Sequence, residues 1–244
     1  MADPLTRSMF EGQGSGFCAC ADLRKGVMYI TYPCRNDEIM NFAVFHPTKP
    51  HQVDAEDWNS PATVEDVLEM LEGFHPAWRA IAKQADADAM KCYTVGHRDL
   101  IPRMTNGRTA IIGDAAHPMQ PTHAQGGAVS IEDAAALGVL FSGWTATDSV
   151  EKRLALFNQL RLPRDNVTQL MSNAMFYNSD SAEQMLQRVR QYYAGPLLEK
   201  GLTGWSEPVQ DFFYGYDAFA EAEEAMKYKD DPDGIPEGAI KHFW

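Results

Sequence analysis

The sequence predicts an α+β fold, in which an antiparallel sheet near the start of the chain is followed by a largely helical half. Apolar strand patterns over residues 27–32 and 39–45 flank a polar turn at 35–38, which is a hairpin signal. Further along, apolar residues recur at helical spacing, including Val129 and Leu140. The 244 residues are 45% hydrophobic, which suffices for one large or two small domains with a sizeable core.

The first hundred residues alternate between strand and helix signals. Thr63 and Asp66 have the spacing of a capping box, so a helix should begin there. The polar, glycine-rich start of the chain predicts no regular structure. The elements expected in this part are, in order, an irregular lead-in (1–16), strands (17–21, 27–32 and 39–45), a polar linker (46–60), a helix (61–74), a second helix after His75-Pro76, and a strand (91–95).

A strand, a polar loop and a helix follow one another directly between residues 107 and 140. The apolar run 109–112 predicts a short strand buried in a sheet, and Asp114 follows at its carboxyl end, where open α/β folds collect ligands. The helix opens with Gly126 and Gly127, which allow a ligand to approach bare backbone N–H groups. Because the helix dipole favours negative charge at that end, this stretch predicts a cofactor-binding site.

The run GDAAHPMQPTHAQG followed by IEDAAAL resembles the second flavin-binding motif of the FAD-dependent aromatic hydroxylases, which include salicylate- and phenol-type monooxygenases. The similarity continues upstream in TYPCRNDEIMNF and downstream in RLALFNQLRLPR and FFYGYDAFAEAEEA, and so covers nearly the whole chain. It implies that Asp114 hydrogen-bonds hydroxyl groups of FAD and that Pro121 lies near the reactive edge of the flavin ring. The backbone of Gly126, Gly127 and Ala128 would face the pyrimidine end of the ring.

The chain departs from the family pattern at one place that matters for the cofactor. Family members carry G-x-G-x-x-G in a βαβ unit that holds the ADP half of FAD. The run GQGSG at residues 12–16 follows no predicted strand, opens no predicted helix and lacks the third glycine, so we reject it as a dinucleotide site. We therefore expect a chain that begins inside the family's middle domain, without the ADP-binding unit. Met104, where relatives often carry tryptophan, should affect packing more than chemistry.

The resemblance also implies a division of the chain. A substrate-domain-like sheet with helices would occupy residues 1–100, the strand–loop–helix of the second flavin motif 101–145, and C-terminal helices 146–244. The fold would then be an antiparallel substrate-domain sheet with the remnant of a flavin-binding α/β domain and a helical C-terminal part. The predicted C-terminal elements are a helix capped by Ser149 and interrupted at Pro163, its continuation through Met175, helices at 182–193 and 212–229, and a loop at 230–237.

In the family, one face of the sheet covers the substrate pocket. Tyr32, Asn41 and Phe45 could therefore line a pocket, although ordinary sheet packing is the favoured interpretation of each. The C-terminal tail helix should pack back on the sheet, as in relatives.

Several histidines and arginines allow a catalytic and a structural interpretation. The run His97-Arg98-Asp99 could hold a poised base, but a turn with a local ion pair is favoured because adjacent residues rarely converge on one site. His117 and His123 lack a surrounding metal-ligand pattern, so both are interpreted as loop residues, with His117 ordering the loop. No catalytic residue is assigned.

Charged residues on the helices are interpreted in the same way. Glu132 and Asp133 are neighbours on a helix and should point apart, so they form no carboxylate pair. Anion steering toward the flavin or substrate is one role for the arginines of the C-terminal helices, and a solvated or ion-paired helix face is the favoured interpretation. These arginines are Arg153, Arg161 and Arg164.

Composition excludes several classes of partner. A net charge of −13 argues against nucleic acid and anionic membrane surfaces, and the longest apolar stretch, 134–141, is too short to span a bilayer. No secretory leader is recognised, so a cytoplasmic location with reduced thiols is expected. Alternation on a strand explains Cys18-Ala19-Cys20 more simply than a redox pair does. The remaining cysteines are Cys34 and Cys92.

The function predicted from the resemblance is that of a FAD-dependent monooxygenase of secondary metabolism, hydroxylating an aromatic or polyketide-like small molecule with NAD(P)H as reductant. Two alternatives remain open at this stage. One is a flavin-free isomerase or cyclase that retains the fold and orients a reactive intermediate. The other is a catalytically silent fragment, and a homo-oligomer would cover the surface left by the missing domain.

Overall fold

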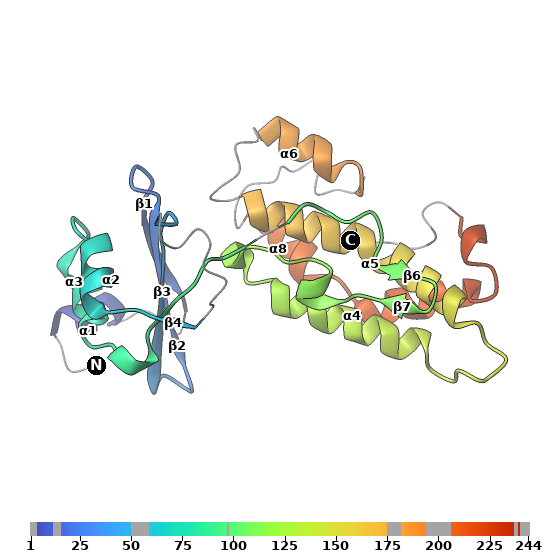
Figure 1. The fold of residues 1–244 in the computed structure, drawn as a ribbon, viewed down its shortest axis with the longest axis horizontal. Helices are drawn as coiled ribbons and strands as arrows, with labels where there is room; N and C mark the ends of the chain where they lie inside the picture. The colour runs from blue at the N-terminus through green and yellow to red at the C-terminus, as the bar shows by residue number, and fades with distance from the viewer. Residues whose placement is uncertain are drawn as a thin grey trace. The chain divides into compact units, whose positions relative to one another are not determined.

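The computed structural model describes residues 4–11, 16–49, 59–96, 98–174, 182–193, 206–236 and 239. The chain divides into two compact units, Met1–Val95 and Gly96–Trp244. Antiparallel strands form the centre of the first unit and helices form most of the second (Figure 1), so the predicted α+β class is confirmed. None of the described helices combines the length and apolar character needed to cross a bilayer.

The first unit is a three-stranded antiparallel sheet with helices on one face (Figure 1). Its sheet has the order β1 (Cys18–Asp22), β2 (Val27–Cys34), β3 (Ile39–Phe45), which confirms the predicted hairpin. The other elements are α1 (Pro4–Phe10), α2 (Val64–Met70), α3 (Pro76–Ala82), a 3-10 turn at Ala87–Ala89, and a short ladder of β4 (Ser60–Pro61) with β5 (Lys91–Cys92).

Aromatic side chains form the core between the sheet and the helices of this unit. Tyr29 is fully buried, stacks on Phe42 at 5.8 Å between ring centroids and meets the ring of Trp78 edge-on at 4.6 Å. Cys18 and Cys20 face the same core, and burial raises the pKa of the Cys20 thiol to about 11. A thiol with a raised pKa is a poor nucleophile, so strand alternation explains these cysteines.

The opposite face of the sheet carries the three residues proposed from the sequence to line a pocket. Strand alternation places Tyr32 on this face, because Tyr29 points into the core. The register pairs Tyr32 with Asn41 and Met28 with Phe45, so all three candidates share one face. Tyr32 is 40% exposed.

Two local predictions for the first unit concern the start of the chain and the helix at residues 61–74. The prediction of an irregular lead-in over residues 1–16 is wrong, because Pro4–Phe10 forms the helix α1. Met9 and Phe10 of this helix pack against the core. The capping box of α2 is confirmed, with the Thr63 hydroxyl accepting from the backbone N–H of Asp66 at 3.1 Å. This helix ends four residues earlier than predicted, and the strand predicted at 91–95 keeps only its first two residues.

The second unit is built around two long helices. Its elements are the hairpin of β6 (Thr105–Asn106) and β7 (Thr109–Ala110), 3-10 turns at Gly113–Ala115 and Pro121–His123, α4 (Gly126–Leu140), α5 (Val150–Ala174), α6 (Ala182–Val189), α8 (Glu207–Tyr214), α9 (Ala218–Ala225), and 3-10 turns at Met226–Tyr228 and Pro232–Gly234. The predicted helix after Gly126 is therefore confirmed. Ser149 caps α5, accepting from the N–H of Lys152 at 3.2 Å.

Three predictions for this unit are wrong. The run 109–112 is not a buried strand, because β7 is two residues long and Ile111 and Ile112 are 37% and 38% exposed. Among the described residues β7 pairs only with β6, so no sheet covers the isoleucines. The tail helix predicted at 212–229 breaks between α8 and α9, where the Asp217 side chain caps α9. Within this unit, the α9 part of the tail packs on α4 and α5.

The helix α5 also runs through Pro163 without interruption. Proline removes one backbone hydrogen bond and costs about 3 kcal/mol in a helix interior. The loss is offset because Phe157 and Leu160 before the proline and Val167 after it are all fully buried, and each such side chain contributes about 1.5–3 kcal/mol. Packing therefore decides the path of this helix.

Substituting Phe157 by alanine should lower the free energy of unfolding by about 3–5 kcal/mol, because the ring is fully buried and leaves a cavity in the main core of the second unit. Phe219→Ala is the matched control, since Phe219 is 61% exposed and its loss should change stability by less than about 0.5 kcal/mol. Chemical denaturation followed by far-UV circular dichroism measures both. Equal effects would contradict this core assignment.

Candidate functional site

The N-terminus of α4 is an uncapped row of backbone donors. Gln125 occupies the cap position, but its side chain donates to the carbonyl of His123 at 3.1 Å and makes no cap hydrogen bond. The N–H groups of Gly126, Gly127 and Ala128 have no carbonyl inside the helix to bond to. The first turn carries no acidic side chain. The positive end of the helix dipole is therefore left for an external acceptor.

Asp114 lies beside this helix start. A Cβ placed on Gly126 would come within 3.9 Å of Asp114 Oδ1, and a Cβ on Gly127 would meet nothing within 4 Å. Asp114, Gly127 and Ala128 are exposed. The structure thus brings a carboxylate acceptor together with free N–H donors on an accessible surface. Pro121, also exposed, begins the 3-10 turn that leads into α4.

The loop between Asp114 and α4 is held in a fixed shape by contacts with α5. The N–H of Gln120 donates to Asn173 Oδ1 at 2.9 Å, and the hydroxyl of Thr122 donates to a carbonyl near the end of α5. His123 is buried, with its ring 5.2 Å from that of Phe213. Ala124 has a φ of 53°, a left-handed conformation that costs a non-glycine residue about 1–2 kcal/mol. The loop interpretation of His123 is thus supported, with burial as the added finding.

Arg98 holds two segments of the second unit together through hydrogen bonds. Its Nη2 donates to the carbonyls of Ala115 and Ala116 at 2.7 and 2.6 Å, and its own carbonyl accepts from Gln169 Nε2 at 2.9 Å. Arg98 therefore ties the segment before β6 to the turn that carries Asp114. His97, the base in the catalytic interpretation of this run, lies outside the described residues.

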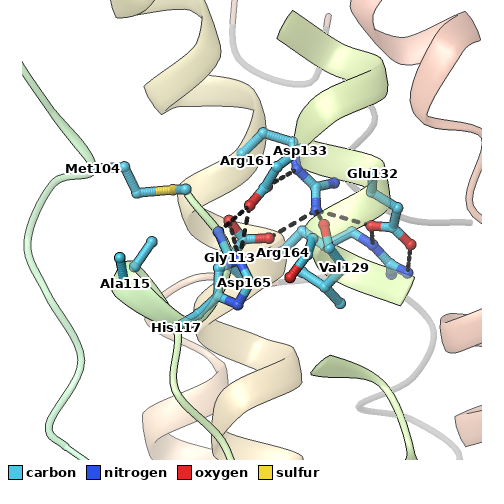
Figure 2. Close-up of polar contacts among 12 residues, drawn as sticks. Met104, Gly113, Ala115, His117, Val129, Glu132, Asp133, Arg161, Arg164 and Asp165 are labelled. Carbon is cyan, nitrogen blue, oxygen red and sulfur yellow. Dashed lines mark hydrogen bonds and ion pairs between the residues drawn. The ribbon is translucent and has the colours of Figure 1, made fainter. Parts of the chain in front are cut away.

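A buried network of charged side chains lies beneath the turn (Figure 2). Asp133 Oδ2 accepts from the N–H of Gly113 at 3.0 Å and from His117 Nε2 at 2.8 Å. Asp133 Oδ1 accepts from Arg161 Nε at 2.9 Å. Nη2 of the same guanidinium reaches Asp165 Oδ1 at 2.8 Å. His117, Asp133, Arg161 and Asp165 are each no more than 1% exposed. The predicted role of His117, ordering the loop, is confirmed.

Two arginines of α5 bind the acidic pair of α4. Arg161 Nη2 lies 2.9 Å from Glu132 Oε2, and Arg164 holds both oxygens of Glu132, through Nε at 2.7 Å and Nη2 at 2.8 Å. Glu132 and Asp133 are predicted to point apart and to form no carboxylate pair; the structure adds that Arg161 contacts both. The ion-paired alternative for these arginines is confirmed, and Arg153 likewise contacts Asp148 at 3.0 Å. The solvated alternative is wrong, because all three side chains are buried.

The electrostatics of the network favour ionised Asp133 and Arg161. Burial alone would raise the pKa of Asp133, but the hydrogen bond from His117 and the charge of Arg161 hold that pKa below its usual value. Burial alone would lower the pKa of Arg161, and the surrounding acidic groups, chiefly Asp165, hold it well above its usual value.

One atom each of His117, Asp133 and Asp165 lies within 4.8 Å of the others, a spacing that a metal ion could bridge. Both oxygens of Asp133 are already occupied by protein donors, and the Arg161 guanidinium contacts two of the three side chains. A cation placed there would face a fixed positive charge. The arrangement fits a network of ion pairs and not a metal centre.

Comparison with known proteins finds a FAD-binding family and relatives named as monooxygenases and hydroxylases. A family model described as FAD binding domain matches residues 3–173. A FAD-dependent monooxygenase of Aspergillus candidus is 32% identical, over 94% of this chain and 51% of the relative. Hispidin-3-hydroxylase of Neonothopanus nambi is 31% identical, over 81% of this chain and 42% of the relative. The chain thus spans about half the length of the curated relatives it matches.

The fold is shared with solved structures. The crystal structure of CtdE in complex with FAD and a substrate matches with a TM-score of 0.69 at 18% identity, covering 96% of this chain and 54% of that one.

Replacing Arg161 by methionine should destabilise the second unit by about 3–5 kcal/mol, because it leaves buried carboxylates without their counter-charge. Arg108→Met is the control, since Arg108 and its partner Glu151 lie 3.8 Å apart with both side chains exposed, and it should have no measurable effect. Urea denaturation compares the two variants. Similar stabilities would show that the network does not hold the unit together.

Proposed function

The chain belongs to the FAD-binding domain family, and from that premise we propose that it forms the part of a FAD-dependent monooxygenase that holds the flavin end of the cofactor and presents the substrate to it. The observation that carries the proposal is the open N-terminus of α4, where free N–H groups and the carboxylate of Asp114 meet at an accessible surface. No described side chain caps these donors.

The residues present fit the flavin end of FAD. Asp114 would accept hydrogen bonds from hydroxyl groups of the cofactor, as the family motif implies. The backbone N–H groups of Gly126, Gly127 and Ala128 would donate to the pyrimidine carbonyl edge, and the dipole of α4 would favour negative charge there. Pro121 would stand at the reactive edge of the ring. The left-handed Ala124 fixes the direction in which the loop enters the helix.

The sheet face that carries Tyr32, Asn41 and Phe45 is the proposed substrate side of the first unit. Aromatic and amide side chains on one face suit a planar, hydroxylated ring, which stacks on aromatic groups and exchanges hydrogen bonds with an amide. One relative is, by its name, a hydroxylase of the small molecule hispidin. We propose an aromatic or polyketide-like small molecule as the substrate class, with NAD(P)H as reductant.

FAD, when bound, supplies the chemistry of oxygen activation and transfer of one oxygen atom to the substrate. The tasks of this chain are then positional. Asp114 and the start of α4 would orient the ring, and Pro121 would lie at its edge. We assign no described side chain as a catalytic acid or base.

The visible absorption spectrum of the purified chain, before and after addition of FAD, tests the proposal. A flavin spectrum should be retained or gained, and Asp114→Ala should weaken FAD binding at least tenfold, about 1.4 kcal/mol, by removing charge-assisted hydrogen bonds. NADPH oxidation with phenolic substrates would then be measured. A colourless, monodisperse protein that ignores added FAD would overturn the proposal and favour a flavin-free cyclase.

Gly127→Ala separates ligand binding from stability. The added methyl group meets no protein atom within 4 Å and alanine favours helix, so stability should stay the same or rise by up to about 1 kcal/mol. FAD binding should weaken, because the methyl group occupies the space through which the flavin approaches. Gly138→Ala is the matched control on the same helix, also with open space around it, and it should leave binding unchanged. Equal binding by both variants would contradict the assignment.

A further inference from the structure

A single carboxylate oxygen holds both ends of the segment that carries Asp114. Asp133 Oδ2 accepts from the N–H of Gly113, at the start of the segment, and from Nε2–H of His117, at its end. The carbonyl of Gly113 closes the segment by accepting from the N–H of His117 at 2.9 Å. Gly113 has a φ of 59°, which glycine alone adopts without strain. The direction of Asp114 therefore depends on a residue that lies below the surface.

The buried network holds more carboxylates than guanidinium groups. The carboxylates of Glu132, Asp133 and Asp165 face the guanidinium groups of Arg161 and Arg164, which leaves one negative charge in excess. The other groups in contact are His117 and the phenol of Tyr216, whose ring lies under both guanidinium groups. An isolated buried charge is costly, so neutrality requires one additional proton in the network.

Two side chains can hold that proton. His117 Nε2 lies 4.0 Å from Asp165 Oδ2. His117 Nδ1 and Asp165 Oδ2 are both buried and find no hydrogen-bond partner among the described residues. A proton on Nδ1 gives a cationic imidazolium, and a proton on Asp165 gives a neutral carboxyl group. Either state leaves the network neutral.

The pKa values of Asp165 and His117 are both raised. Burial raises the pKa of Asp165 to about 7, despite the opposing charge of Arg161. Burial alone would lower the pKa of His117, but its hydrogen bond to Asp133 and the charges of Asp165 and Asp133 raise it above its usual value. The folded network therefore retains its extra proton at a pH where the same two side chains of the unfolded chain have lost it.

We propose that Asp133, His117 and Asp165 act as positioning residues for Asp114, and that they hold the Gly113–His117 turn in its binding geometry only while the network contains one shared proton. We call these three residues the proton clamp. The proposal rests on the proposed function for the role of Asp114, whereas the clamp itself is a property of the protein without ligand. When the proton leaves, the network carries one uncompensated negative charge in the interior. The turn then separates from α4, which lets water reach that charge.

The sign of the pH dependence follows from the two raised pKa values. Between the unfolded value of 3.8 for Asp165 and its folded value of about 7, the folded state binds more protons than the unfolded state. Stability is therefore highest at the acidic side of this range and is lost as the pH rises through 7. The lowered pKa of Asp133 acts in the opposite sense and removes stability only in acid, below its usual value of 3.8.

The full chain without ligand provides the first test. Between pH 5.5 and 8.5 the melting temperature should fall by about 3 °C or more, and the backbone amide of Gly113 should titrate in NMR spectra with the same midpoint as the ring of His117. Asp165→Asn mimics the protonated carboxyl group, so it should fold normally and lose at least half of this melting-temperature change.

Asp148→Asn is the matched control. Asp148 also pairs with an arginine of α5, but it lies outside the network and its pKa is lowered to about 2, chiefly by hydrogen bonds from Thr145. Its replacement should leave the profile between pH 5.5 and 8.5 as in the original chain. A Gly113 amide that does not respond to pH, or an Asp165→Asn profile equal to that of Asp148→Asn, would overturn the proposal.

FAD titration provides the link to binding. The affinity of the unaltered chain should fall at least fivefold between pH 6 and pH 8.5, while that of Asp165→Asn should change less than twofold. Asp133→Asn, which replaces one acceptor oxygen by a donor, should bind at least tenfold more weakly at both pH values. A chain that binds no FAD at any pH would contradict the proposed function, and the melting and NMR profiles would still decide the clamp.

Discussion

The carboxylate of Asp133 is the constraint on which the second unit depends. It is fully buried, and each of its oxygens is occupied by donors from a different part of the chain: the Gly113–His117 turn on one side and α5 on the other. Burying such a charge is unfavourable unless its partners hold it closely. In the protonated network the turn, α4 and α5 therefore keep their relative positions, because separating them would leave Asp133 without its donors.

This constraint explains how a loop with little regular structure can present a well-defined surface. Between Gly113 and Gly126 the backbone forms only two 3-10 turns. Its shape comes from outside the loop, through Asp133, the carbonyl contacts of Arg98, and the contacts that Gln120 and Thr122 make with α5. Asp114, Gly127 and Ala128 are exposed, whereas His117, Gln120 and Thr122 are buried and hold the loop to the helices beneath it.

The parts of the fold that could be predicted from sequence are those specified locally. The hairpin around residues 35–38, the capping box at Thr63 and the helix from Gly126 each depend on residues a few positions apart. The wrong predictions concern elements decided by distant neighbours. The run 109–112 has strand composition, but burial needs a covering sheet. Pro163 signals a break, but the buried residues on both sides of it keep α5 continuous.

The candidate site likewise has a part that could be predicted from the local sequence and a part that depends on distant residues. Its surface residues lie within one sequence motif, so Asp114 and the glycines could be named in advance, whereas Asp133 and Arg161 are 28 residues apart and meet only after α4 and α5 pack. The i, i+4 spacing of Arg161 and Asp165 was a readable signal for an ion pair. Asp133 lies seven residues beyond Gly126, about 10 Å along the helix. The backbone donors proposed to bind the ligand lie in the first turn of α4 and the buried carboxylate lies in its second turn, so a displacement of α4 that misplaces the donors also strains the buried charges.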